Sequence, residues 1–151
     1  MNRCKQIPAR LATKQEILTV HSETHYKKLQ DICKVSEEEQ ESFCSEYDSV
    51  YTNANTYEAA LLAAGCTLDV VDQVLDGTIQ NGMAIVRPPG HHAMEEEYCG
   101  YSFFNNVAIA AISALKKGYS NVLIVDFDVH HGQGTQQAFY NDPRYIILLR
   151  I

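Results

Sequence analysis

The spacing of apolar residues divides the chain into helical segments and short strands. Over residues 56–75 apolar side chains recur at helical spacing, which predicts one long and mostly buried helix. Three short apolar runs, at residues 83–86, 121–125 and 145–149, contain β-branched residues and predict buried strands. Because helical segments separate these runs, the sequence predicts an α/β fold with a parallel sheet.

Capping signals place two more helices in the first third of the chain. Thr13 is followed three residues later by Glu16, a capping-box pattern that predicts a short helix. Ser22 can cap a second helix that extends to residue 32. Residues 36–41 are strongly acidic and residues 47–55 are polar, so we expect a solvated run and a turn-like segment there.

Helix signals return on both sides of the strand predicted at residues 121–125. Asn105 or Asn106 can cap a helix over residues 107–115, which two lysines and a glycine then close. Residues 134–140 predict one or two helical turns. Each predicted strand except the last is therefore followed by a helical segment.

Composition places the chain among ordinary globular domains. It has 151 residues, of which 46% are hydrophobic and 21% charged, and this length can bury a core. The formal net charge of −7 argues against general affinity for nucleic acid or anionic membranes and is compatible with cationic partners such as lysine-rich peptides. The sequence shows no signal segment, membrane-spanning run or Cys-x-x-Cys pair. We therefore expect a reducing compartment, either the cytoplasm or the nucleus.

Acids and imidazoles follow the strand predicted at residues 121–125. Side chains alternate across a strand, so Asp126, Asp128 and His130 project to the same side if the backbone stays extended. Ligands bind at this end of parallel strands, and carboxylate oxygen with imidazole nitrogen suits a metal such as zinc. A lone Asp-x-Asp is more often a solvated strand end, but together with His130 and a loop that carries His91 and His92 it indicates a metal site, to which the first loop contributes two ligands. His131 has the opposite parity and is interpreted as structural.

A second chemical loop follows the run at residues 83–86. Residues 88–90, Pro-Pro-Gly, form a rigid, extended and then turning segment that delivers His91 and His92 at the end of the predicted strand. Imidazoles titrate near neutral pH, so the pair can serve in acid/base chemistry or as ligands.

Other reactive or aromatic side chains are interpreted as structural. His21 and His25 lie in no cluster of metal-binding residue types, so we expect surface or satisfied structural histidines. Phe103 and Phe104 are expected in the core, and Cys99 is expected to be a small packed residue.

Three segments in this order resemble the signatures of the zinc-dependent histone deacetylase family. They are residues 87–92 (Arg-Pro-Pro-Gly-His-His), residues 100–105 (Gly-Tyr-Ser-Phe-Phe-Asn) and residues 126–135 (Asp-Phe-Asp-Val-His-His-Gly-Gln-Gly-Thr). The similarity is greatest to the class II branch and, within it, to the first catalytic domain of the two-domain cytoplasmic deacetylases of tubulin and histones. It implies a three-layer arginase/deacetylase-like α/β fold with a parallel sheet, of which residues 1–151 form roughly the N-terminal half.

The resemblance implies a zinc-dependent protein lysine deacetylase, which hydrolyses acetyl-lysine in histone tails, tubulin or similar proteins. It assigns Asp128 and His130 as zinc ligands, and Asp126 as the residue that orients His91 and helps to hold a structural potassium ion. His92 would be the general base toward the zinc-bound water, and His91 would supply electrostatic stabilisation.

The same resemblance assigns a partner and a substrate channel. Gln133 would be the hydrogen-bond partner of the general base. Tyr101 would line the channel that grips the acyl-lysine stem, and Gly100 would meet its backbone. Asp48 or Ser49 lies where the channel rim of the family receives the amide of the substrate.

The chain also departs from the family pattern. The family takes its third zinc ligand, an aspartate, and the tyrosine that polarises the acetyl oxygen from later segments. Its opening strand and first rim loop also have no counterpart, and residues 148–151 differ from its serine-leucine-histidine run. We therefore expect the 151-residue chain alone to be inactive, and poorly soluble because a truncated parallel sheet exposes edge groups and apolar faces.

Two functional classes stay open from the sequence. The first is a deacetylase represented by an incomplete chain, and the second is a catalytically inactive truncated isoform or remnant that acts, if at all, as a binding module. A metal hydrolase of the related arginase or polyamine-deacetylase type is disfavoured by the turn at Gly100 and Tyr101 and by the sequence after His130. The sequence indicates no oligomeric state.

Overall fold

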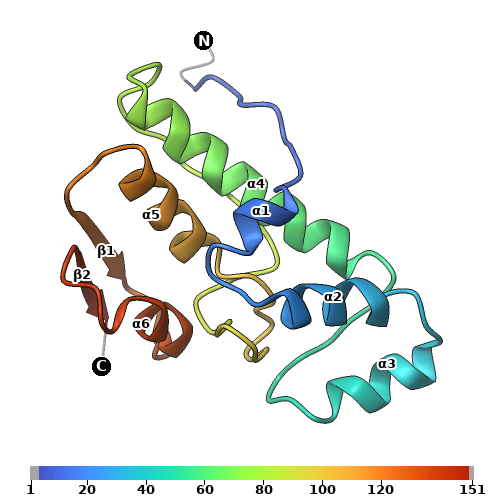
Figure 1. Ribbon diagram of the computed structural model, residues 1–151. Coiled ribbons are helices and arrows are strands. Elements are labelled where there is room, and N and C mark those ends of the chain that lie inside the picture. The colour runs from blue at the N-terminus through green and yellow to red at the C-terminus, as the bar shows by residue number, and fades with distance from the viewer. Residues whose placement is uncertain (1–3, 150–151) are drawn as a thin grey trace.

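The computed structural model describes residues 4–149 as a set of packed helices with a small parallel sheet at one side (Figure 1). In chain order the elements are α1 (Lys14–Ile17), α2 (Glu23–Ile32), α3 (Glu37–Cys44), α4 (Thr56–Leu75), α5 (Asn106–Lys116), β1 (Val122–Asp126), α6 (Gln133–Phe139) and β2 (Tyr145–Leu149). Within residues 4–149 every helix is too short or too polar to cross a lipid bilayer.

The predicted helix starts and ends are confirmed. Thr13 caps α1, Ser22 caps α2 and Asn105 caps α5, each with a side-chain oxygen that accepts a backbone N–H of the first turn. Gly77 and Gly118 follow the ends of α4 and α5 with positive φ values of 79° and 98°. The α4 bounds are those that the apolar spacing predicts, although its last turns are only half-buried.

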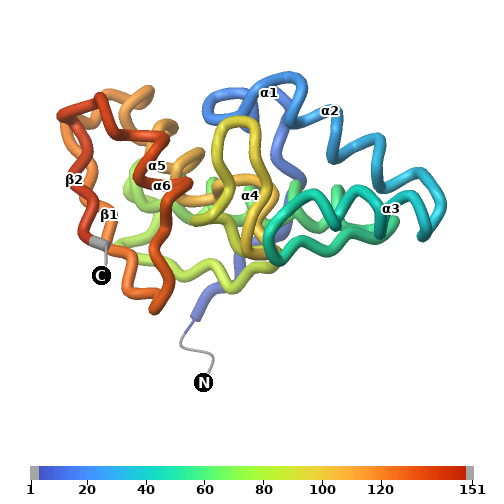
Figure 2. Tube along the Cα trace, turned by 90° about the horizontal axis from the view of Figure 1, so that it is seen from below, coloured from blue at the N-terminus to red at the C-terminus, as the bar shows by residue number. Residues whose placement is uncertain are grey.

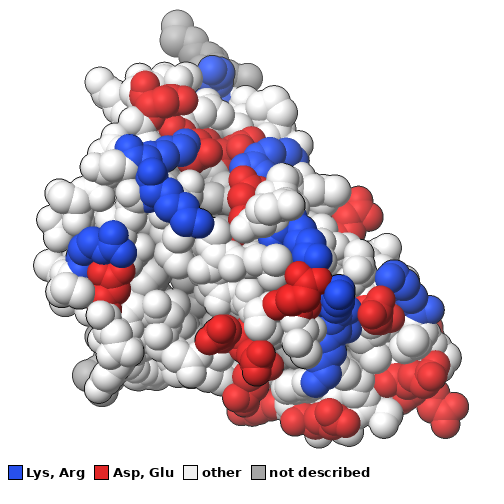
Figure 3. Space-filling model, in the orientation of Figure 1, with Lys and Arg blue, Asp and Glu red and all other residues white. Residues whose placement is uncertain are grey.

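A further helix, α3, occupies the acidic segment that the sequence predicted only as a solvated run. Ser36 and Glu39 form a capping box in which the serine hydroxyl accepts the Glu39 N–H at 3.3 Å and the glutamate accepts the Ser36 N–H at 3.1 Å. Acidic side chains fill the first turn, where the helix dipole stabilises negative charge. Figure 3 shows acidic side chains gathered over this end of the molecule.

The main core lies where α4 packs alongside α5, together with α1, α2 and the loop that precedes α5 (Figure 1). The largest wholly buried side chains include Ile17, Leu29, Leu68, Tyr98, Phe104 and Ile109. Phe103 and Phe104 are both buried, which confirms their predicted place in the core.

The two strands are parallel, with Val122 opposite Tyr145 and Asp126 opposite Leu149. Ile124 is buried against α5 and α6, whereas the alternating residues Leu123 and Val125 are exposed. The prediction of strands buried on both faces is therefore wrong for the described residues, because helices cover only one face of this sheet.

The prediction of a strand at residues 83–86 is also wrong. The segment is irregular, and Met83 and Ile85 are 81% and 87% exposed. A strand forms only beside a partner, and no strand of the described chain lies next to this segment. A cavity of about 690 Å³, which Ala84 and Val125 both line, separates it from β1.

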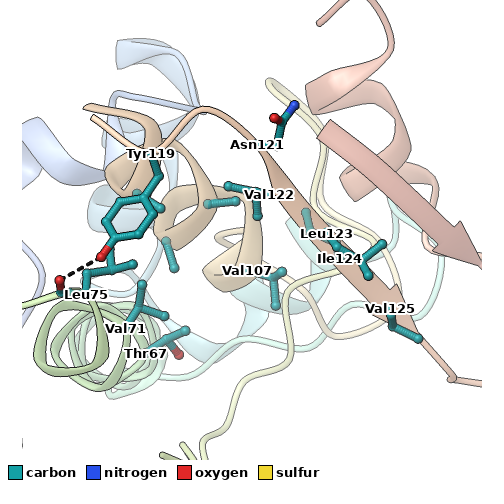
Figure 4. Close-up of a pocket in the computed structure, with 13 residues that line it drawn as sticks. Thr67, Val71, Leu75, Val107, Tyr119, Asn121, Val122, Leu123, Ile124 and Val125 are labelled. Atoms are coloured by element: carbon teal, nitrogen blue, oxygen red, sulfur yellow. Dashed lines mark hydrogen bonds between the residues drawn. The ribbon is translucent and has the colours of Figure 1, made fainter. Parts of the chain in front are cut away.

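A second cavity, the apolar groove, runs along β1 (Figure 4). It has a volume of about 490 Å³ and is bounded by Val71 and Leu75 of α4, Val107 of α5 and residues 122–125 of β1. Tyr119 closes one end, where its hydroxyl donates to the Leu75 carbonyl at 2.7 Å. The sheet thus presents an open apolar face rather than a second helical layer.

Candidate active site

The loop that carries the predicted histidine pair is held between two parts of the chain that are distant in sequence. Figure 2 shows this loop, in yellow, between α6 and the α1–α2 end of the molecule. The Ser22 N–H donates to the Glu95 carbonyl at 3.2 Å, and the Thr135 N–H donates to the His91 carbonyl at 3.2 Å. Both ends of the loop are therefore fixed by backbone hydrogen bonds.

His91 is paired with Asp126, which lies 35 residues further along the chain. The imidazole Nδ1 lies 2.8 Å from the Asp126 Oδ2, and both side chains are mostly buried. A Cβ at Gly132 would lie 2.6 Å from that carboxylate oxygen and 3.0 Å from His91 Nδ1. Only glycine at this position leaves room for the pair.

His92 is paired with Gln133 at the start of α6. Its Nδ1 lies 2.7 Å from the Gln133 Oε1, and the amide oxygen can only accept, so Nδ1 carries the proton. The other ring nitrogen, Nε2, is then free to accept a proton. The His91 and His92 rings lie 4.0 Å apart between centroids, so the two imidazoles act at one place.

Asp128 and His130 converge, although the backbone does not stay extended as the parity argument assumed. β1 ends at Asp126, whose Oδ1 accepts the Asp128 N–H at 3.1 Å, and Asp128 Oδ1 in turn accepts the His130 N–H at 2.8 Å. These turns bring His130 Nδ1 to 2.9 Å from Asp128 Oδ1. The backbone N–H of His130, followed by its ring, lowers the pKa of the Asp128 carboxyl.

Asp128 and His130 offer the kinds of ligand atom that zinc binds, but they are too few for a complete zinc site. One carboxylate oxygen and one imidazole nitrogen are ligands that zinc accepts, and on a shared tetrahedral zinc they would stand roughly 3.3 Å apart, given bonds of about 2.0 Å. The 2.9 Å between Asp128 Oδ1 and His130 Nδ1 requires only a small opening. Within residues 4–149 no group of three or more His, Cys, Asp or Glu side chains converges to hold a metal ion. Among the described residues, Asp128 and His130 could supply two zinc ligands, and a tetrahedral site needs four.

The four predicted substrate-binding residues come together in one rim. The Gly100 N–H donates to the Asp48 carbonyl at 3.0 Å and the Tyr101 N–H donates to the Ser49 carbonyl at 2.8 Å. Ser49 and Tyr101 have φ values of 54° and 60°, the positive-φ non-glycine residues of the described chain. Such backbone costs of order 1–3 kcal/mol per residue and clusters at functional sites.

The rim also touches the histidine pair. Gly100 has a φ of 52°, and a Cβ added there would lie 2.2 Å from the His92 ring. Tyr101 is 55% exposed, so its side chain is free to contact a bound molecule. The imidazoles and the rim thus form one continuous surface.

Several residues lie outside this constellation or were missed by the sequence analysis. The His131 side chain bonds to Gln136 at 2.6 Å and does not join His130, as predicted. The sequence analysis gave Asn105 only a capping role and gave Thr135 no role, yet the Asn105 amide donates to Thr135 Oγ1 at 3.2 Å beneath the histidine loop. Both residues fall inside the quoted motifs, and that position was the only signal for them.

Comparisons with known proteins agree with one another. The histone deacetylase domain matches residues 1–148. Polyamine deacetylase HDAC10 of Danio rerio is 50% identical over 143 residues, which is 93% of this chain and 21% of that protein. Histone deacetylase HDA1 of Candida albicans is 44% identical over 146 residues, with shares of 95% and 18%. Histone deacetylase 9 of Homo sapiens is 38% identical over 167 residues, with shares of 98% and 16%.

A solved structure gives the same result for the fold. The crystal structure of the HDA15 HD domain superposes with a TM-score of 0.86 and 37% sequence identity, over 96% of this chain and 40% of that chain. The prediction of an α/β fold that corresponds to part of a deacetylase domain is confirmed at this level. The chain spans about a fifth of the length of these curated relatives.

Proposed function

Because the chain belongs to the histone deacetylase family, with class II relatives, we propose that it forms part of a zinc-dependent deacetylase that hydrolyses acetyl-lysine in proteins. The observation that carries the proposal is the double pairing of His91 with Asp126 and of His92 with Gln133, beside Asp128 and His130. We treat residues 1–151 as one partial deacetylase domain.

In the proposed reaction water adds to the acetyl carbonyl carbon and the bond from that carbon to the lysine nitrogen breaks, which releases acetate and the free amine. His92 accepts the proton of the attacking water at Nε2, because Nδ1 is occupied by Gln133. His91, held by Asp126, stabilises the negative charge that develops on the way to the tetrahedral intermediate. One imidazole of the pair then returns a proton to the leaving amine.

Asp128 and His130 are the residues proposed to hold zinc, together with a ligand from outside the described chain. Zinc, when bound, supplies a water of lowered pKa and polarises the acetyl oxygen. Asp126 is proposed to help hold a structural potassium ion in addition to orienting His91. With zinc bound, the histidine pair needs only to position and deprotonate the attacking water.

The rim is proposed to receive the substrate. Tyr101 and Gly100 contact the apolar stem of the acyl-lysine, and Asp48 or Ser49 binds its backbone amide. The exposed ring of Tyr101 and the strained backbone of Ser49 support this assignment. Cytoplasm or nucleus stays the predicted compartment.

A second substrate class has specific support. The sequence alone disfavoured a polyamine deacetylase, yet proteins named polyamine deacetylase HDAC10 are 50% identical in Danio rerio and 44% identical in Homo sapiens. An acetylated polyamine shares the acetyl-amine group and the flexible stem of acetyl-lysine but lacks a peptide backbone. The comparisons resolve the family and leave the choice of acyl-amine substrate to experiment.

The test assays two preparations against two substrates. The native protein recovered from cells with an antibody to the α4 segment, and the purified 151-residue chain, are each given an acetyl-lysine peptide and an acetylated polyamine, with and without a hydroxamate inhibitor. We expect hydroxamate-sensitive hydrolysis by the native protein and negligible turnover by the short chain, since two ligands hold zinc weakly. If only the acetylated polyamine is hydrolysed, the substrate is a polyamine and the proposal of an acetyl-lysine substrate is wrong.

A matched pair of variants assigns the site. His92→Ala removes the proposed base, whereas His131→Ala removes a neighbouring motif histidine that bonds to Gln136. We expect activity to fall about 10²–10⁴-fold in the first variant and to stay within a few-fold in the second. Equal effects would refute the assignment, and no hydrolysis by any preparation would favour the inactive binding remnant.

A further inference from the structure

His21 is a buried imidazole that the proposed chemistry does not use. It follows α1, is 3% exposed and stacks on His25 with ring centroids 4.6 Å apart. From the sequence, His21 was expected to be either a surface histidine or a structural one, and its burial shows that it is structural. A buried polar ring is retained at a cost unless both nitrogens are hydrogen-bonded.

The two nitrogens of His21 bind the loop that carries the histidine pair and the residue that caps α5. Nδ1 lies 2.8 Å from the Met94 carbonyl, and Nε2 accepts the Asn105 N–H at 2.9 Å. A carbonyl can only accept and a backbone N–H can only donate, so the ring is held as the neutral Nδ1–H tautomer. Burial, and then the nearby charge of protonated His25, lower the pKa of His21 to about 3, which keeps the tautomer neutral near pH 7.

Asn105 extends the contact toward the reacting groups. Its side-chain amide donates to the Ala93 carbonyl at 3.3 Å and to Thr135 Oγ1 at 3.2 Å. The Thr135 N–H holds the His91 carbonyl at 3.2 Å. Three carbonyls of the loop, those of residues 91, 93 and 94, are therefore fixed by one connected set of side chains and one backbone amide.

This set also reaches the partner of the base. Thr135 lies two residues after Gln133 in the first turn of α6, and Gln133 accepts the Nδ1–H of His92. A shift of the loop relative to α6 would lengthen this hydrogen bond. A displacement of about 1 Å at a reacting group costs about 10²-fold in rate.

We propose that His21, with Asn105 and Thr135, is a positioning residue that clamps the His91–His92 loop against α6. The proposal rests on the proposed deacetylase function for its kinetic consequence only, since the clamp itself is a property of the fold. His21 acts through its two hydrogen bonds and does not touch substrate or transfer a proton.

The exchange experiment uses the 151-residue chain and hydrogen–deuterium exchange read by mass spectrometry. His21→Phe keeps a buried ring in the stack but removes both hydrogen bonds. His25→Phe is the matched control, because His25 is 1% exposed in the same stack and bonds to the Phe103 carbonyl instead of the Met94 carbonyl. We expect His21→Phe to raise exchange at least tenfold in peptides covering residues 91–94 and 133–139, and His25→Phe to leave those peptides unchanged.

A rescue variant separates positioning from general loss of packing. His21→Asn retains an N–H that can reach the Met94 carbonyl, in the place of Nδ1–H. We expect His21→Asn to restore part of the protection at residues 91–94, while the backbone N–H of Asn105 stays unprotected. This variant also decides the matter if His21→Phe does not fold.

The kinetic experiment uses whichever preparation hydrolyses the acetylated substrate. We expect His21→Phe to lower kcat about tenfold or more with KM unchanged, because the rim at Tyr101 and Ser49 is held by its own hydrogen bonds. Uniformly raised exchange in both Phe variants, or unchanged exchange at residues 91–94, would overturn the clamp. If no preparation is active, the proposed function fails, whereas the exchange result still decides the clamp.

Discussion

At the residue scale, the site depends on Gly132 because glycine has no side chain. Its position would place a Cβ 2.6 Å from the carboxylate oxygen that orients His91. A methyl group there must push Asp126 or His91 aside, because real Cβ contacts are never this short. The glycine is therefore required by the geometry of the pair.

We expect Gly132→Ala to lower deacetylase activity by about 10²-fold, since the His91–Asp126 hydrogen bond would be broken or displaced. Steady-state kinetics in an active preparation measure this. Gly77→Ala is the control, because it strains a positive φ but meets nothing within 4 Å. It should cost about 1–2 kcal/mol of stability and leave kcat unchanged. Equal losses of kcat in both variants would contradict the prediction.

The buried ring of His21 predicts a pH dependence of folding. Its pKa falls from 6.5 to about 3 on folding, so the unfolded chain binds a proton that the folded chain excludes. The contribution of His21 to stability is therefore complete above pH 6.5 and declines as the pH falls toward 3. Between pH 7 and pH 5 this decline amounts to about 2 kcal/mol.

Urea unfolding followed by circular dichroism measures the effect, because the chain contains no tryptophan for fluorescence. We expect the wild-type stability to fall more steeply from pH 7 to pH 5 than that of His21→Phe. A residual slope should stay in the variant, since burial also lowers the pKa of His25. Parallel pH profiles for the two chains would show that His21 is not the group responsible.

At the element scale, local signals predicted every described helix except α3 and failed for one strand. Caps such as Thr13, Ser22 and Asn105 act within a single turn, so they can be recognised from the sequence. α3 was missed because its acidic residues conceal a helical period and only its capping box marks the start. The segment at residues 83–86 has strand composition, but pairing depends on a neighbour that local sequence does not encode.

We expect Ser36→Ala to destabilise α3 by about 1 kcal/mol, because the capping hydroxyl is lost. Hydrogen exchange in residues 37–44 should rise, while α4 and the histidine loop keep their protection. Thr24→Ala is the control, an exposed change inside α2 with no capping role. An equal rise of exchange in α4 would contradict the prediction, because it would mean that α3 is part of the main folding unit.

The paired side chains of the candidate site could be predicted from the sequence, whereas the residues that hold them in place could not. Asp126, Asp128, His130 and the histidine pair stand out as chemical residue types placed after apolar runs, and the family resemblance supplied their partners. Those pairings appear in the structure, although their roles stay predictions. The supports at His21 and Thr135 could not be predicted, since they depend on contacts between segments far apart in the chain.

At the scale of the whole molecule, the apolar groove beside β1 distinguishes this chain from a closed domain. Leu123 is 60% exposed, and Val125 and Val107 are also exposed along the same groove. β1 pairs only with β2 among the described strands, so its other edge offers free backbone groups. The matched structure is covered over only 40% of its length, which leaves most of that domain without a counterpart here.

We expect the purified 151-residue chain to associate in proportion to its concentration, because an open sheet edge and an apolar groove favour self-association. Leu123→Lys should reduce this association by placing a charge in the groove. Tyr140→Lys is the control, since Tyr140 is 77% exposed but lies outside the groove. Light scattering over a range of concentrations measures the effect, and equal behaviour of the two variants would contradict the role of the groove.

The carboxylate of Asp126 serves two parts of the site at once. One carboxylate oxygen holds His91, while the other accepts the Asp128 N–H and shapes the turn toward His130. A substitution at Asp126 would therefore disturb the His91 hydrogen bond and the turn toward His130 together. The positions of His91 and Asp128 are coupled through this one carboxylate, so a change in one is expected to be felt at the other.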